Sequence, residues 1–246
     1  MSGDGVLRAG PGSTNGRKDD ELMVEAAGKT RGSFEAELGL LREDLLRMGA
    51  LVKEAVHRAV QALKEQDLEL AQEVVDGDEI VDTMEHKIEE KCLRLLALQQ
   101  PMAVDLRAIG TALKTVTDLE RMADHSSDIA KVALRIGREP LIKPLVDIPR
   151  MAAIIEEMLD GGLKAYVTRD IAAAQEVARR DEDVDHLYAQ IYRELLTYML
   201  EDPRTIRQAT HLLFVAQHLE RIADHVTNVS EWVVYLVHGE MRDLNP

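Results

Sequence analysis

The amino-acid sequence predicts an all-α fold, organised as two tandem three-helix bundles with six long helices. Aromatic residues make up only 3% of the chain, so the core must consist mainly of Leu, Val, Ile, Ala and Met, as in packed helices. Apolar residues recur at helical spacing through most of the chain. A seven-residue sequence also occurs twice, one hundred residues apart, which indicates an internal repeat.

The first helix is expected to follow a disordered tail. Residues 1–32 hold seven of the fifteen glycines, scattered among polar residues without apolar periodicity, as is typical of disorder. Ser33 is the predicted N-cap of a helix with apolar residues at helical spacing as far as Leu63. The first three-helix bundle is therefore predicted to span residues 33–137.

The other two helices of this bundle are marked by their ends. Asp67 can cap a second helix, in which Gly77 marks a potential break. Pro101 ends that helix, because proline cannot continue a helix interior. The third helix is predicted from about Met102 to Ile136, and a helix of ~30 residues spans ~45 Å.

A linker is predicted between the two bundles. Residues 138–149 contain three prolines, which disfavour a helix there. Helical periodicity then resumes in a second bundle predicted at residues 150–246. Asp170 and Pro203 divide it into three helices, the last of which is predicted from about Arg204 to Val237.

The two halves match beyond a single motif. The sequence LERMADH at 119–125 recurs as LERIADH at 219–225, and DxxxAQEV at 67–74 recurs at 170–177. Matching positions differ by 103 early in the repeat and by 100 late, so the second copy is three residues shorter. Two copies of one three-helix unit explain these identities far better than chance.

Each half carries acidic pairs on its second and third helices. Residues four apart lie on one helix face, and antiparallel packing of the two helices would bring both pairs together. The candidates in the first half are Asp78, Asp82, Glu120, Asp124 and Asp128. Those in the second half are Asp181, Asp185, Glu220, Asp224 and Asn228.

Two interpretations of these clusters stay open. Four or more carboxylate oxygens suit a hard cation such as Mg²⁺, Ca²⁺ or Mn²⁺, or iron held mainly by carboxylates. Alternatively, Arg121 and Arg221, each three residues before an aspartate, could neutralise the clusters through ion pairs worth ~0.2–0.5 kcal/mol. Acidic pairs at this spacing are also common on solvated helix faces.

The histidines of the repeated motif are not expected to bind metal. His125 and His225 are rotated about 100° from the preceding aspartates, which favours helix capping or an interhelical hydrogen bond. Three histidines fall at heptad spacing on the sixth helix: His211, His218 and His225. Only one of their three equivalents in the first half is a histidine, so this stripe is not part of the repeated design.

Composition limits the partners and the compartment. The net charge of −15 argues against nucleic acid, which requires a basic surface. The single cysteine, Cys92, excludes internal disulfides and fits a reducing compartment. No apolar run approaches the ~18 residues of a membrane span, and the N-terminus does not resemble a signal peptide. The chain is therefore expected to be cytoplasmic, without membrane insertion.

Enzymatic function is the weaker hypothesis. The sequence has no Gly-rich phosphate loop, no Cys pair for zinc and no nucleophile elbow. A ferritin-like oxidase needs Glu-x-x-His on two helices, and only Glu54 and His57 fit that spacing. The alternatives are a carboxylate-bridged metalloenzyme, either an oxidase or a phosphohydrolase, and a purely structural helical adaptor.

The paired LERxADH segments, the closing sequence NVSExVVYLVxGE at 228–240 and the tandem layout resemble the PhoU family of phosphate-specific transport accessory proteins and regulators. The resemblance covers about residues 34–240. It implies two three-helix bundles, usually in a homodimer, and repression of phosphate-starvation signalling when phosphate is plentiful. It also implies contacts with a sensor histidine kinase and with the ATPase of the phosphate ABC transporter.

The resemblance further implies metal sites, occupied by iron, manganese, magnesium or zinc. The family signature Glu/Asp-x-x-x-Asp falls on Asp78 and Asp82 with Glu120 and Asp124 in the first half. In the second half it falls on Asp181 and Asp185 with Glu220 and Asp224. Because Asn228 stands where the first half has Asp128, the second site is less anionic, and the two sites are expected to differ in affinity or metal count.

Overall fold

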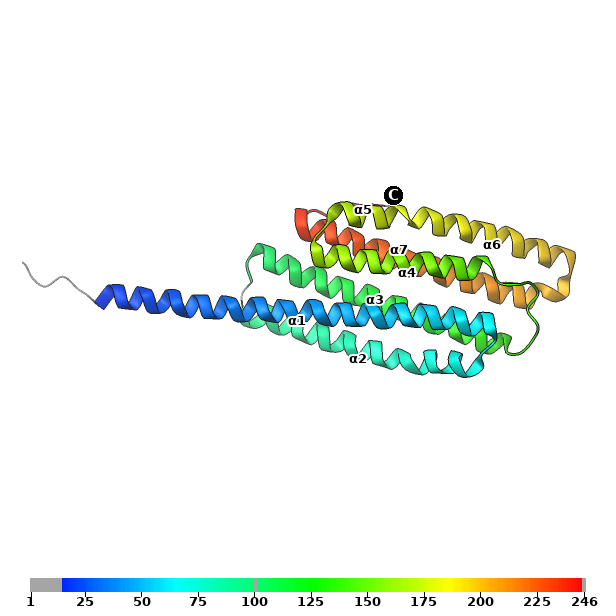
Figure 1. Cartoon of the computed structure of the whole chain (residues 1–246), viewed down its shortest axis with the longest axis horizontal. Helices are drawn as coiled ribbons and strands as arrows, with labels where there is room; N and C mark the ends of the chain where they lie inside the picture. Colours follow the sequence, from blue (N-terminus) through cyan, green and yellow to red (C-terminus); the bar gives the residue numbers. More distant parts are fainter. Residues whose placement is uncertain (1–14, 100, 245–246) are drawn as a thin grey trace, which may run out of the picture. The chain divides into compact units, whose positions relative to one another are not determined.

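The computed structural model describes residues 15–99 and 101–244, and this part of the chain contains seven α-helices, one short 3₁₀ helix and no strand (Figure 1). The first repeat comprises α1 (Asn15–Glu65), α2 (Leu68–Gln99) and α3 (Ala103–Ile136). The second comprises α4 (Asp147–Thr168), α5 (Ile171–Arg179), α6 (Asp181–Glu201), η1 (Pro203–Thr205) and α7 (Ile206–His238). The predicted all-α class with tandem helical repeats is confirmed.

The chain divides into two compact units, Met1–Gly39 and Leu40–Pro246. The second unit holds α2 to α7 together with the part of α1 that follows Gly39, and the packing described below lies within it. This division falls inside α1, so the predicted bundle limits at residues 137 and 150 stay a prediction.

The start of the first helix corrects one expectation. Residues 1–14 of the predicted disordered tail lie outside the described residues. Residues 15–32 belong to α1, and Ser33 therefore lies inside the helix and not at its N-cap. The physical reason lies in residues 17–27, RKDDELMVEAA, which are mostly strong helix formers, while an isolated glycine in a helix costs only about 1 kcal/mol.

The same turn joins the first two helices of each repeat. Gln66 and its equivalent Arg169 both adopt a left-handed backbone with φ of 55°. The side chain of Asp67 then accepts backbone hydrogen bonds from the residues two and three positions further on, at 3.1 and 3.0 Å. Asp170 accepts one from the residue three positions further on, at 3.0 Å. The predicted cap at Asp67 is confirmed, and Asp170, which was predicted only as a break between helices, is the N-cap of α5.

The second helix is continuous in the first repeat and interrupted in the second. Arg180 separates α5 from α6, and its amide donates to the Val177 carbonyl at 3.0 Å in a tight turn. Its guanidinium pairs with Glu157 at 3.0 Å. The equivalent residue in the first repeat, Gly77, lies inside the continuous helix α2. The break predicted at Gly77 is therefore absent from α2 and occurs at the equivalent position of the second repeat, where Arg180 is paired with Glu157 of α4. The predicted fifth helix is two helices, α5 and α6.

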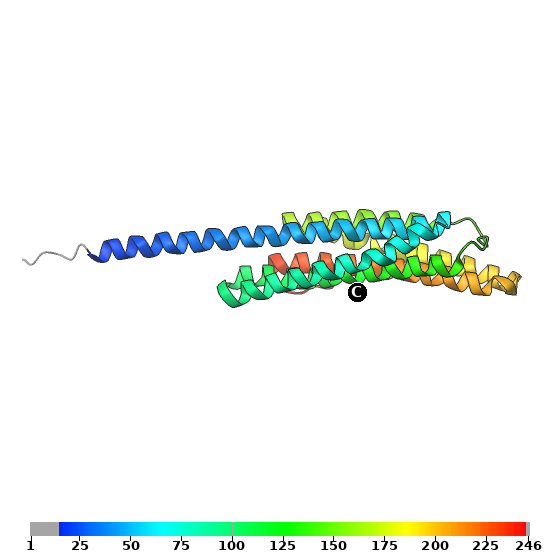
Figure 2. The same cartoon turned by 90° about the horizontal axis from the view of Figure 1, so that it is seen from below.

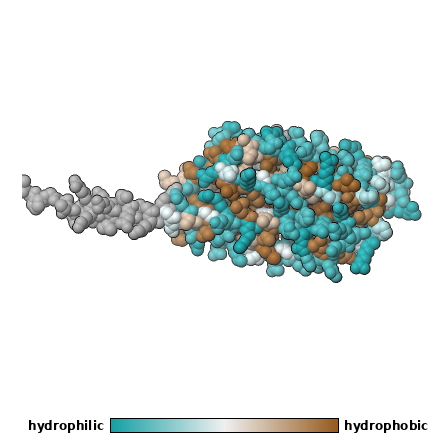
Figure 3. Space-filling view, in the orientation of Figure 1, coloured by the Kyte–Doolittle hydropathy of each residue, from teal (hydrophilic) through white to brown (hydrophobic). Residues whose placement is uncertain are grey.

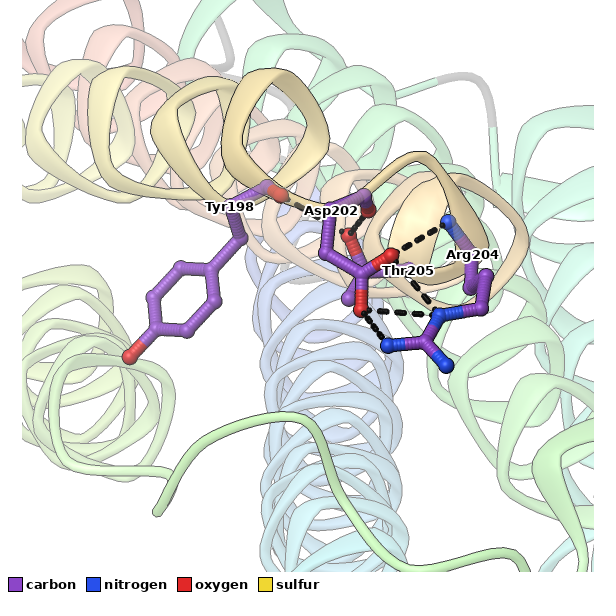
Figure 4. A network of polar contacts seen from close by, with 4 residues as sticks. All are labelled: Tyr198, Asp202, Arg204 and Thr205. Atoms are coloured by element: carbon purple, nitrogen blue, oxygen red, sulfur yellow. Dashed lines mark hydrogen bonds and ion pairs between the residues drawn. The ribbon is translucent and has the colours of Figure 1, made fainter.

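A polar network fixes the corner between α6 and α7 (Figure 4). The Asp202 carboxylate accepts hydrogen bonds from the backbone and guanidinium of Arg204 at 2.8–3.1 Å. The Thr205 hydroxyl donates to the carbonyl oxygens of Tyr198 and Asp202, at 3.0 and 2.7 Å. Because these bonds satisfy the end of α6 just before Pro203, the predicted helix end is confirmed.

Two glutamines hold the linker between the repeats. Gln66 donates from its side-chain amide to the carbonyl oxygens of Gly137 and Glu139, at 3.0 and 2.6 Å. Gln208 of α7 is buried; it accepts from the amide of Ile142 at 2.6 Å and donates to a second linker carbonyl at 3.1 Å. The segment therefore has defined contacts with both repeats. The predicted linker ends too late, because residues 147–149 form the first turn of α4, where a proline is tolerated.

The repeats meet along two pairs of helices. On one side, α1 lies against α4: an added Cβ on Gly49 would come 2.2 Å from a methyl carbon of Leu163, and Lys53 pairs with Asp160 at 2.5 Å. On the other side, α3 and α7, the third helix of each repeat, lie side by side (Figures 1 and 2). Their pairing is antiparallel, because contacts run in opposite order along the two helices: Asp118 contacts His225, whereas the later His125 contacts the earlier His218.

The repeated motif sits at the centre of this second contact. Its apolar members are buried in both copies: Leu119, Met122, Ala123, Leu219, Ile222 and Ala223. The helix period then places the acidic residues of the motif on a different face of α3 and α7 from these apolar residues. Packing of the motif thus determines where its carboxylates and histidines lie.

Candidate metal centres

The predicted acidic residues of the first repeat meet across α2 and α3. Burial raises the pKa of Asp78 above its usual value, and the negative charges of Asp124 and Asp82 raise it further. Such repulsion requires proximity, so Asp78 of α2 lies close to Asp124 of α3, and Asp82 acts on both Asp78 and Glu120. The juxtaposition expected from antiparallel packing of the second and third helices is found.

Glu120 is the most strongly perturbed member of this group. Burial, followed by the charges of Asp124 and Glu85, raises its pKa to about 7. Glu85 was missed by sequence reasoning, although it lies three residues after Asp82 and hence on the same side of α2. Glu85 does not belong to the repeated acidic pattern, because its equivalent in the second repeat is Tyr188.

Arg121 pairs with the cluster without neutralising it. Its guanidinium nitrogens lie 3.5 Å from a carboxylate oxygen of Glu120 and 3.5 Å from one of Asp124. The Arg121 side chain is 57% exposed, so solvent screens both ion pairs. Arg121 lowers the pKa of Glu120, but burial and then the charges of Asp124 and Glu85 outweigh it and keep that pKa near 7. The first acidic cluster keeps an excess of negative charge.

The second repeat has a corresponding cluster across α6 and α7. Burial and then the charge of Asp224 raise the pKa of Glu220, and Asp185 raises it further. Burial and then Asp185 likewise raise the pKa of Asp224. Asp181 is 2% exposed and lines a polar pocket together with Asp224. The four carboxylates predicted for the second site therefore gather in one region.

Asp128 and Asn228, which were predicted with the acidic clusters, contact the other repeat instead. Each is rotated about 40° from the aspartate four residues before it, toward the face that carries the motif histidine. Asp128 pairs with Lys131 at 3.0 Å and lies beside the histidines of the interface between α3 and α7. Asn228 donates to Asp118 of α3 at 3.2 Å. Asp128 and Asn228 come eight residues after Glu120 and Glu220, and this step turns them about 80° around the helix, away from the face of the acidic cluster.

The motif histidines form interhelical contacts, as predicted. Nδ1 of His225 lies 2.9 Å from an Asp118 carboxylate oxygen, and Nδ1 of His125 lies 3.2 Å from Nδ1 of His218. These contacts are equivalent, because the repeat offset of one hundred exchanges Asp118 with His218 and His125 with His225. Two members of the heptad stripe, His218 and His225, thus contact the residues of α3 that are equivalent to them in the repeat, His125 and Asp118.

Burial dominates the protonation of the two paired histidines. It lowers the pKa of His125 to about 4, with further lowering by the positive charges of protonated His218 and His225. Burial also lowers the pKa of His218. Both imidazoles are therefore neutral at pH 7. Neutral imidazole is the form that binds metal ions.

The other candidates from the sequence lead to no catalytic centre. Glu54 and His57 are both exposed, and His57 pairs with Glu156 of α4 at 3.1 Å. A ferritin-like site requires such side chains to project into the bundle core, which these do not. The Cys92 thiol is fully buried, and burial raises its pKa to about 12, so it is not a reactive thiol.

Comparison with known proteins decides the family. The PhoU domain matches residues 45–133 and again residues 148–233. The chain belongs to the PhoU family. A phosphate-specific transport system accessory protein PhoU homolog of Clostridium acetobutylicum is 44% identical, over 88% of this chain and 99% of the relative. One from Aquifex aeolicus is 46% identical, over 83% and 93%.

Solved structures of PhoU proteins share the fold. The crystal structure of PhoU from Pseudomonas aeruginosa superposes with a TM-score of 0.81 at 40% identity, covering 84% of this chain and all of that one. The phosphate transport system regulatory protein PhoU from Streptococcus pneumoniae gives a TM-score of 0.80 at 33% identity, covering 85% and 99%. The resemblance inferred from the paired motifs is thus confirmed. In residues 15–99 and 101–244 of this PhoU protein, no helix has the length and apolar character needed to cross a membrane.

Replacing Glu120 is expected to weaken a pH dependence of stability. Its folded-state pKa of about 7 exceeds the ordinary 4.5, so this group favours folding at low pH and that contribution is lost as pH rises from 4.5 to 7. The shift corresponds to at most ~3 kcal/mol, before solvent screening. Urea unfolding of chelator-treated protein should show a smaller loss between pH 5 and pH 8 in Glu120→Gln than in wild type. The exposed Glu79→Gln is the control, and an unchanged loss in Glu120→Gln would contradict the burial described.

Proposed function

We propose that this protein regulates phosphate uptake and represses phosphate-starvation signalling when phosphate is plentiful. The observation that carries the proposal is the match of both repeats to the PhoU domain, in a chain that spans nearly all of relatives named as phosphate-specific transport accessory proteins. A single shared repeat would support only the fold. The solved PhoU structures share the fold over 84–85% of this chain as well.

The proposed mechanism is protein contact and not catalysis. Its partners are a phosphate-responsive sensor histidine kinase and the ATPase of the phosphate ABC transporter, which a cytoplasmic homodimer would reach. The surface in Figure 3 is mainly hydrophilic with scattered hydrophobic patches. Exposed apolar side chains include Ile80, Leu93 and Leu98. Together with the net charge of −15, such a surface suits partners that present basic and apolar residues.

The acidic clusters are proposed to bind metal, with Mg²⁺, Mn²⁺, iron or zinc as the candidates. Their chemistry fits a hard cation, because the donors are carboxylates, and burial followed by the charges of neighbouring carboxylates raises the pKa of Asp78, Glu120 and Asp224. In the first repeat the ligands would be Asp78, Asp82, Glu120 and Asp124. In the second they would be Asp181, Asp185, Glu220 and Asp224. A bound cation would offset the repulsion and hold α2 to α3 and α6 to α7.

Deletion of the gene tests the regulatory proposal. Phosphate-starvation genes should be expressed in phosphate-rich medium in the deletion strain, because the repressing contact is gone. The wild-type gene and the surface control Glu79→Gln should both restore repression. Repression that persists in the deletion strain would contradict the proposal. Co-purification of the kinase and the transporter ATPase with the tagged protein identifies which partner is bound.

Metal addition to chelator-treated protein tests the proposed role of the clusters. A ligand that binds only the folded state stabilises it by ~2.7 kcal/mol at one hundred times its dissociation constant, so Mn²⁺ should raise the melting temperature. The double variant Glu120→Gln, Glu220→Gln should lose most of this rise, whereas Glu79→Gln should retain it. No metal above trace in protein purified without chelator, together with no stabilisation by Mn²⁺ or iron, would refute metal binding by the acidic clusters. Regulation by protein contact would survive that result.

A further inference from the structure

The contact between α3 and α7 contains a second set of potential ligands, chemically different from the acidic clusters. His125 and Asp128 lie three residues apart on α3, so both side chains project from one face of that helix. His218 reaches them from α7. The ligand atoms of these three residues all lie within 4.8 Å of one another, and the side chains are half-buried. Among the described residues of the acidic clusters, no three carboxylates approach one another that closely.

The spacing of the two imidazoles fits a tetrahedral metal ion. Zn²⁺ binds histidine nitrogen at ~2.0–2.1 Å, so two nitrogens at tetrahedral angles lie about 3.3 Å apart. Nδ1 of His125 and Nδ1 of His218 are 3.2 Å apart. The Asp128 carboxylate supplies a third ligand and leaves a fourth position for water. Two imidazoles with one carboxylate suit zinc and its neighbours in the first transition row, whereas hard cations prefer oxygen alone.

We infer that His125, Asp128 and His218 bind a transition-metal ion of the Zn²⁺ class between the two repeats. Such an ion would join α3 to α7 directly, and thus one repeat to the other. The proposed acidic sites differ in this respect, since each lies within a single repeat. The inference does not depend on metal binding by the acidic clusters.

Neighbouring side chains determine which positive groups compete with a metal ion and how solvent reaches the site. The ammonium group of Lys131 lies 3.0 Å from one carboxylate oxygen of Asp128, so a metal must use the other oxygen or displace the lysine. Arg221 adds positive charge near both imidazoles. A polar pocket lined by His125, Arg221 and His225 gives solvent access to the region. The imidazole of His225, whose centroid is 5.8 Å from that of His125, is bonded to Asp118.

The repeat provides an internal comparison. The offset of one hundred maps His218, His125 and Asp128 onto Asp118, His225 and Asn228. The second set also meets in space, with both His225 and Asn228 bonded to Asp118. It contains one imidazole and a neutral amide, which is a poor ligand for a transition metal. One site per chain is therefore expected.

Zinc titration of the full-length, chelator-treated protein tests the inference, with a chromogenic chelator as competitor and Co²⁺ absorption as a report on ligand type. Wild type should bind one equivalent of Zn²⁺ per chain that a large excess of Mg²⁺ does not displace. His218→Asn and His125→Asn each remove a ligand, so affinity should fall at least by the ~10–100-fold that loss of a supporting residue costs. Asp128→Asn should weaken binding in the same direction and change the Co²⁺ spectrum.

Three further variants separate metal ligation from other effects. His211→Asn, on the same helix, should leave the affinity unchanged, as should Glu120→Gln in the first acidic cluster. Lys131→Gln should tighten Zn²⁺ binding, because it frees Asp128; a mere hydrogen bond between the two imidazoles predicts no such gain. Circular dichroism without metal confirms that each variant is folded. Equal Zn²⁺ affinity in wild type, His125→Asn and His218→Asn, displacement by Mg²⁺, or no Zn²⁺ binding at all would overturn the inference.

Discussion

The antiparallel packing of α3 against α7 is the constraint on which the rest of the protein depends. It places the two copies of the repeated motif opposite each other, and the apolar residues of both copies are buried. Burial of these side chains contributes roughly 1.5–3 kcal/mol for each large one, far more than the surface ion pairs between α1 and α4. Within the unit Leu40–Pro246, neither repeat has its third helix fully covered without the other.

This packing gives one motif two chemical roles. Around the helix, the acidic pair of the motif turns toward the second helix of its own repeat, and the histidine turns about 100° further, toward the other repeat. Carboxylates thus gather within each repeat, where burial and mutual repulsion raise their pKa values. Imidazoles gather between the repeats, where burial lowers the pKa of His125 and His218. The helix period therefore separates the acidic pairs of the motif from its histidines.

The fold was predictable because its signals are local or repeated, whereas pairing between repeats was not. The cap at Asp67, the break at Asp170 and the helix end before Pro203 depend on neighbouring residues and were predicted correctly. The duplicated motif also located the acidic clusters. Sequence comparison of the halves, however, aligned His218 with Asp118 and discounted the stripe, although these residues lie on facing helices. Glu85 was missed for a similar reason, since only its own repeat has the carboxylate.

A double-mutant cycle across α3 and α7 tests this dependence most directly. Asp118→Ala, His225→Ala and the double variant would be compared with wild type by urea unfolding of the full chain. Since the two side chains share a hydrogen bond with a carboxylate acceptor, a coupling free energy of ~1–3 kcal/mol is expected, with one cooperative transition. Additive effects within ~0.5 kcal/mol, together with separate transitions for the two repeats, would contradict the packing described.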